Sequence, residues 1–145
     1  MGMGAEDKGR MADDMSETFE EAREQIHAFK PGEVQDYAVA FVRTALALLE
    51  KGVGHICSDA VPESVQVGGG VPGTCVRMLI AAHVIQPVYF TLEAEGIFGG
   101  RKCSSRKSAH GRSVPVYALR GRAIAETFLE RNGANVERGQ RELSL

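Results

Sequence analysis

Two strand-like runs enclose a strongly basic stretch between residues 86 and 119. The first run is QPVYFTL (86–92) and the second is VPVYAL (114–119), and both are rich in β-branched and aromatic residues. The stretch between them, GGRKCSSRKSAHGRS (99–113), carries five Lys and Arg residues and no acidic residue. Charged sequence rich in Ser and Gly stays at the surface. The pattern therefore predicts a β-hairpin whose basic tip makes no contribution to the core.

The clearest helix is expected at residues 33–51. Apolar residues recur there at three- and four-residue steps, and Gly52 follows as a stop signal. Other apolar residues widen this stripe, which indicates a helix that is mostly buried. The recurring residues are Val34, Ala38, Phe41, Ala45 and Leu48.

An acidic segment precedes this helix and is expected to form a helix of its own at residues 16–32. Its narrow apolar stripe allows two interpretations: it packs on the core of its own chain, or it pairs with a second copy. Residues 1–15 are polar, and we expect them to be disordered. The stripe consists of Phe19, Ala22, Ile26 and Phe29.

Three further elements are expected between these helices and the hairpin. Residues 55–57 fit a single edge strand, and Ser58 and Asp59 offer N-cap oxygens to a short helix at 58–65. After a glycine-rich break, Pro72 starts a helix over residues 72–85. Its inward stripe is Val76, Leu79, Ile80 and Val84, and its outward side carries Thr74, Arg77, Met78 and Ala81.

The last expected element is a helix over residues 120–133. Ile124, Phe128 and Leu129 form its inward side, and Gly133 is its stop signal. The polar residues 133–145 are expected to form a flexible tail. The core domain therefore spans residues 33–132.

The net charge of −2 conceals a strong asymmetry along the chain. Residues 1–36 carry ten acidic and four basic residues, whereas residues 96–125 carry seven basic residues and no acidic one. The basic segment is therefore +7, and the rest of the chain is −9. A segment of this kind attracts a polyanion. A second hypothesis is that the acidic arm folds over the basic tip and blocks it.

In the order of its elements the chain resembles the winged helix-turn-helix DNA-binding family, in particular its small bacterial and prophage members. The resemblance rests on SD (58–59) at the start of one helix, GTCVRMLIAAHVIQPV (73–88) as the next helix and strand, and SSRKSAHGRSVPVY (104–117) as the wing. It implies an α+β, mainly α, fold with an extra N-terminal and C-terminal helix. The long glycine-containing turn and the inserted segment 91–100 depart from the family pattern.

The resemblance also implies a function, which is binding of double-stranded DNA in transcription regulation or phage replication. The helix at 72–85 would enter the major groove, and the wing at 99–113 would lie on the backbone or in the minor groove. A dimer through the N-terminal or C-terminal helix would read two half-sites. The implied DNA-binding residues are Thr74, Arg77, Met78, Ala81, Arg101, Lys102, Ser105, Arg106, Lys107, His110 and Arg112.

Two other functions remain open from the sequence. Winged-helix domains also serve as protein–protein adaptors, since a fold does not determine a function. The second of these functions is RNA binding. The residues near the wing that can stack on bases are Tyr89, Phe90 and Phe98.

The sequence contains no motif for catalysis, a metal or a cofactor. The three cysteines form no CxxC pair, the glycines at 68–70 lack a following Lys-Ser or Lys-Thr, and no acid neighbours His110. We therefore expect a non-enzyme without metal or cofactor. The odd number of cysteines suggests a reducing, cytoplasmic location. No apolar run is long enough to cross a membrane, and Cys57 and Cys75 are expected in the core.

Overall fold

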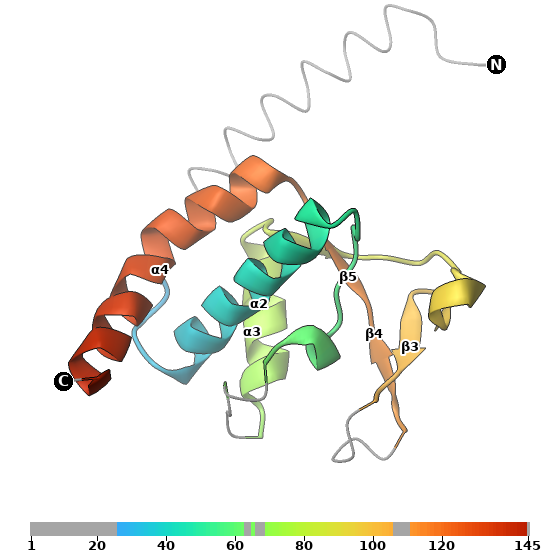
Figure 1. Cartoon of the computed structure of the whole chain (residues 1–145), viewed down its shortest axis with the longest axis horizontal. Coiled ribbons are helices and arrows are strands. Elements are labelled where there is room, and N and C mark those ends of the chain that lie inside the picture. The colour runs from blue at the N-terminus through green and yellow to red at the C-terminus, as the bar shows by residue number, and fades with distance from the viewer. Residues whose placement is uncertain (1–25, 63–64, 66–68, 106–110, 145) are drawn as a thin grey trace, which may run out of the picture.

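The computed structural model describes residues 26–62, 65, 69–105 and 111–144, and of residues 134–144 it describes the backbone alone. These residues form an α+β fold of α-helices and small antiparallel sheets (Figure 1). The α-helices are α2 (Glu33–Glu50), α3 (Val71–Ala81) and α4 (Arg122–Ser144), and the 3-10 helices are η1 (Ser58–Ala60) and η2 (Glu93–Glu95). The strands are β1 (Ile85–Pro87), β2 (Ile97–Phe98), β3 (Arg101–Cys103), β4 (Ser113–Pro115) and β5 (Tyr117–Leu119).

Helix α2 is the centre of the fold and packs against both α3 and α4 (Figure 1). The helix predicted at residues 33–51 is confirmed, and Gly52 follows it with a φ of 86°. The predicted stripe is buried at Ala38, Phe41 and Ala45 and half-buried at its two ends. Because α2 contacts a helix on two sides, it buries residues beyond that stripe, including Val39 and Gln35.

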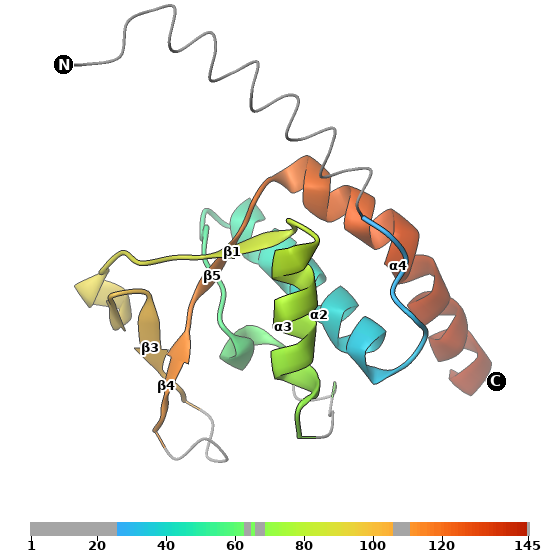
Figure 2. The same ribbon diagram turned by 180° about the vertical axis from the view of Figure 1, so that it is seen from behind.

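The predicted hairpin is present, but it is divided between two sheets. Strand β1 pairs with β5, and β2, β3 and β4 form a separate sheet. Val116 joins them, since its N–H donates to Gly100 O and its carbonyl accepts from Val88 N–H. The run VPVYAL is therefore two short strands. The segment 91–100 supplies η2 and the additional strand β2, and the β3–β4 hairpin extends away from the helices (Figure 2).

The short helix predicted at residues 58–65 is wrong in extent. Of the residues described in this range, only 58–60 are helical, as the 3-10 turn η1, and Val61 is already extended. No side chain caps this turn. Pro62 cannot continue a helix, and the Asp59 carboxylate contacts the hairpin instead of its own N-terminus. The predicted edge strand before it is a single bridge between Ile56 and Tyr117.

Helix α3 ends four residues before the predicted boundary at residue 85. It ends at Ala81, and His83 has a left-handed φ of 60°. The Val84 N–H donates to Leu79 O, and the His83 N–H donates to Ile80 O, which satisfies the last carbonyls. His83 thus takes the place where glycine is more usual, and Ile85 is free to begin β1.

The helix predicted at residues 16–32 falls mostly outside the described residues, as does the predicted disorder of residues 1–15. Its last part is wrong, because residues 26–30 are not helical. Asn132 of α4 holds them, since its Oδ1 accepts from Phe29 N–H at 2.7 Å. The Phe29 ring also packs edge-on against Phe128 at a centroid distance of 5.4 Å. This segment therefore packs on the core of its own chain.

Gly133 does not end the last helix, and the tail predicted to be flexible continues as helix to Ser144. Gly133 is buried where α4 passes α2, and a Cβ there would lie 3.3 Å from Arg43 Nη2. A side chain here would therefore crowd the Arg43 guanidinium, and the helix continues through this glycine. The predicted inward side is confirmed, with Ile124 and Phe128 buried and Leu129 half-buried.

All three cysteines are free, and Cys57 and Cys75 lie in the core as predicted. Burial raises the pKa of the Cys75 thiol to about 12. Cys75 is therefore neutral at physiological pH and acts as a small apolar residue. Cys103 is exposed on β3.

Candidate nucleic-acid interface

The predicted outward side of α3 faces solvent. Arg77, Met78 and Ala81 are exposed and Thr74 is half-buried, whereas Cys75 and Leu79 on the opposite side are buried. Arg77 Nη2 lies 3.4 Å from Thr74 Oγ1, one helical turn away. The four residues predicted on this helix therefore share one accessible face. Of the predicted inward stripe, Val76 and Ile80 are only half-buried.

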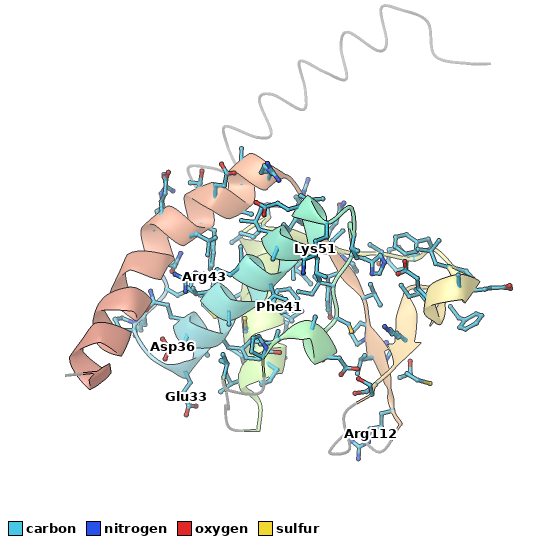
Figure 3. All side chains as sticks on the ribbon, in the orientation of Figure 1. Glu33, Asp36, Phe41, Arg43, Lys51 and Arg112 are labelled. Carbon is cyan, nitrogen blue, oxygen red and sulfur yellow. The ribbon has the colours of Figure 1, made fainter. Side chains whose placement is uncertain are left out.

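The predicted hairpin residues differ in their surroundings. Arg101, Ser105 and Arg112 are exposed, and Lys102 is half-buried on the face that it shares with Ile97 and Val114. Arg112 lies at the far end of the hairpin from the helices (Figure 3). Arg106, Lys107 and His110 lie outside the described residues.

Ser113 of β4 holds the Arg101 side chain across the hairpin. Its Nε donates to Ser113 Oγ at 2.7 Å, and its Nη2 donates to Ser113 O at 2.9 Å. These bonds fix the guanidinium beside β4. The remaining N–H groups of an arginine in this position can still meet an anion.

Not all of the seven basic residues of segment 96–125 belong to the hairpin. Arg120 Nη1 contacts His83 Nδ1 at 3.0 Å, and Arg122 Nη2 lies 3.8 Å from Glu50 Oε1. Both follow β5, at the helical end of the molecule. The basic residues of this segment therefore fall into two groups, one before β5 and one after it in the sequence.

Asp59 is a residue that sequence reasoning placed wrongly, as a helix cap. Its Oδ1 accepts from Ser104 Oγ at 2.6 Å. Its Oδ2 accepts from the Ser105 N–H at 2.7 Å and from Ser105 Oγ at 3.2 Å. The carboxylate thereby anchors the start of the basic tip to η1. No local signal reveals this contact, because 45 residues separate Asp59 from Ser104.

We expect Asp59→Ala to loosen the hairpin without unfolding the protein. The change removes the carboxylate that accepts three hydrogen bonds, one of them from the buried Ser104 hydroxyl. We expect this loss to lower the free energy of unfolding by about 1–3 kcal/mol. Urea unfolding measures that loss, and amide exchange at Ser105 measures the local opening. Glu93→Ala removes an exposed carboxylate and is the matched control. Equal effects of the two changes would show that Asp59 is not an anchor.

Exposed apolar side chains gather on the segment before β3. We call Tyr89, Phe90, Leu92 and Phe98 the aromatic patch; Tyr89 is 80% exposed and Phe98 is 59% exposed. Two carboxylates, Glu93 and Glu95, lie in η2 between them in sequence, and Glu95 Oε2 contacts His55 Nε2 at 2.5 Å. The His55 ring also packs against Phe90 at a centroid distance of 6.0 Å. Sequence reasoning noted the aromatic residues but not that they would be so accessible.

Comparison with protein-family models, with curated proteins and with solved structures finds no match to this chain. Among the residues that the structure describes, no three His, Cys, Asp or Glu side chains are grouped so that they could hold a metal ion. No helix in the described part of the chain is both long and apolar enough to cross a membrane.

Proposed function

We propose that the protein is a winged-helix protein that binds double-stranded DNA, with α3 in the major groove and the β3–β4 hairpin as the wing. Arg77 is the side chain of α3 suited to a bidentate contact with guanine. Thr74 can contact a phosphate, and Ala81 permits close approach or contact with a thymine methyl group. A role in transcription regulation or in phage replication fits this proposal.

One observation carries the proposal: α3 and the hairpin flank the same groove. Arg77 of α3, Pro115 of β4 and Tyr117 of β5 all line it. A duplex placed on α3 would therefore have strands β4 and β5 beside it. The sparse outward face of α3 leaves much of the affinity to phosphate contacts.

The proposal predicts a steep dependence of duplex affinity on salt. Each neutralised phosphate contributes about −0.9 to the slope of log K against log salt. Replacing Arg106, Lys107 and Arg112 by Ala should weaken binding and make the slope shallower by about 0.9 for each phosphate that these side chains neutralise in the wild type. Fluorescence polarisation with random-sequence duplex at several salt concentrations measures both quantities.

A variant with the same loss of charge is the control for this titration. Lys30, Lys51 and Arg122 are exposed and lie on other elements, so replacing them by Ala changes the net charge equally. We expect this variant to keep the wild-type slope. No binding of the wild type at low salt, or the same loss in both variants, would overturn the proposal.

The aromatic patch favours a second candidate function, an adaptor that binds another protein. Exposed aromatic side chains are enriched in protein interfaces, and the carboxylates of η2 are unfavourable beside a phosphate backbone. In this case a Tyr89→Ser/Phe98→Ser variant keeps the duplex affinity of the wild type. A loss of duplex affinity in that variant would instead assign the patch to nucleic-acid binding.

A further inference from the structure

A groove of about 550 Å³ opens between α3, the first half of α2 and the hairpin strands. Its volume lies within the range of small-molecule sites. Most of its wall is apolar, and Val76 and Ile80 of α3 form one side. Both residues were expected in the core, but they are half-buried because they face this groove.

Aromatic rings form the other part of the wall. Tyr37 and Phe41 lie at a centroid distance of 6.4 Å, and Phe41 meets the Tyr117 ring at 6.3 Å with an interplanar angle of 68°. All three residues line the groove. Tyr37 and Phe41 are buried, so the half-buried Tyr117 ring, which they support, is the aromatic surface that a flat apolar body can meet.

The charge at the groove is positive. Among the described residues that line it, Arg77 is the one charged side chain, and no carboxylate is present. The Arg77 Nη2 donates to Thr74 Oγ1, and the other N–H donors of the guanidinium can contact a ligand. On the opposite side, burial raises the pKa of Tyr117, and Arg101 is close enough to lower it in part.

We propose that this groove binds a small molecule with a flat apolar body and a carboxylate group. The carboxylate contacts the Arg77 guanidinium, which has the fork geometry for it, and the body lies against Tyr117, Val76 and Ile80. A nucleobase fits less well, because its hydrogen-bonding edges would face a mostly apolar wall. The inference requires no DNA binding and goes beyond the proposed function.

The test compares two probes of the same shape, 2-naphthoate and the uncharged 2-naphthamide. Isothermal titration calorimetry on the full chain should give about tenfold or tighter binding of the carboxylate, the size of one charge-assisted contact. Arg77→Met should reduce the affinity for 2-naphthoate to that for 2-naphthamide. Amide shifts in NMR spectra should move at Val76 and Tyr117.

Gly73→Leu is a blocking variant that should not impair folding. Gly73 lines the groove in the first turns of α3, and a Cβ added there meets nothing within 4 Å. Leucine is also the better helix former. We expect this variant to lose both probes while keeping the wild-type melting temperature.

Three results would overturn the inference. They are the absence of saturable 2-naphthoate binding at millimolar concentration, equal affinity of the wild type for the two probes, and NMR shifts confined to residues outside the groove. The calorimetry contains no DNA and the salt titration contains no probe. Failure of the groove to bind 2-naphthoate would therefore not contradict the proposed function. Failure of duplex binding would not contradict the proposal of a small-molecule site in the groove.

Discussion

Phe41→Ala should lower the free energy of unfolding by about 3–5 kcal/mol, because it empties the centre of the core. Phe41 is fully buried in the middle of α2 (Figure 3), and its ring meets those of Tyr37 and Tyr117. It thus connects the central helix with β5. Urea unfolding followed by circular dichroism measures the loss.

Phe98→Ala is the control for this prediction, since it makes the same chemical change at a side chain that is 59% exposed. Little apolar area returns to water there, so we expect a change within about 0.5 kcal/mol. Similar losses at the two positions would contradict the placement of Phe41 in the core.

Gly100→Ala should also destabilise the protein strongly, by more than about 2 kcal/mol, through the backbone at the base of the hairpin. A Cβ at this position would lie 1.9 Å from Val88 O, and the φ of 77° is itself unfavourable for alanine. The chain cannot shift easily, because the Gly100 N–H donates to Phe90 O and its carbonyl accepts from Val116 N–H. The junction of the two sheets must therefore open.

Gly99→Ala separates the two causes. Gly99 also has a left-handed φ, of 57°, but a Cβ there meets nothing within 4 Å. Gly99→Ala should therefore lower the free energy of unfolding only by the backbone strain, which is about 1–2 kcal/mol. Thermal unfolding compares the two variants, and faster amide exchange at Val116 in Gly100→Ala locates the damage. A smaller loss at Gly100 than at Gly99 would show that Val88 is not a close neighbour.

The sequence was a good guide where a structure depends on neighbouring residues. The three-to-four-residue period of α2, the glycine after it and the outward side of α3 were all predicted correctly. Each of these depends on periodicity or on a single backbone angle, and a local pattern reports both.

The errors occurred where a distant segment satisfies the backbone or a side chain. Asp59 was expected to cap its own turn, but the hairpin 45 residues later supplies its donors. Residues 26–30 were expected to be helical, but Asn132 binds the Phe29 N–H across 103 residues of sequence. Gly133 was expected as a stop, but Arg43 of α2 occupies the space beside it.

The candidate site also has parts that the sequence predicted and a part that it could not predict. Composition and charge identified the basic hairpin tip, and periodicity identified Arg77 as the cation on the outward face of α3. Neither could reveal the groove between these elements, because its wall combines α2, α3 and β5, which are far apart in sequence. Local patterns specify which residues are buried or exposed within one element. Which elements meet, and what opens between them, is decided by packing in three dimensions.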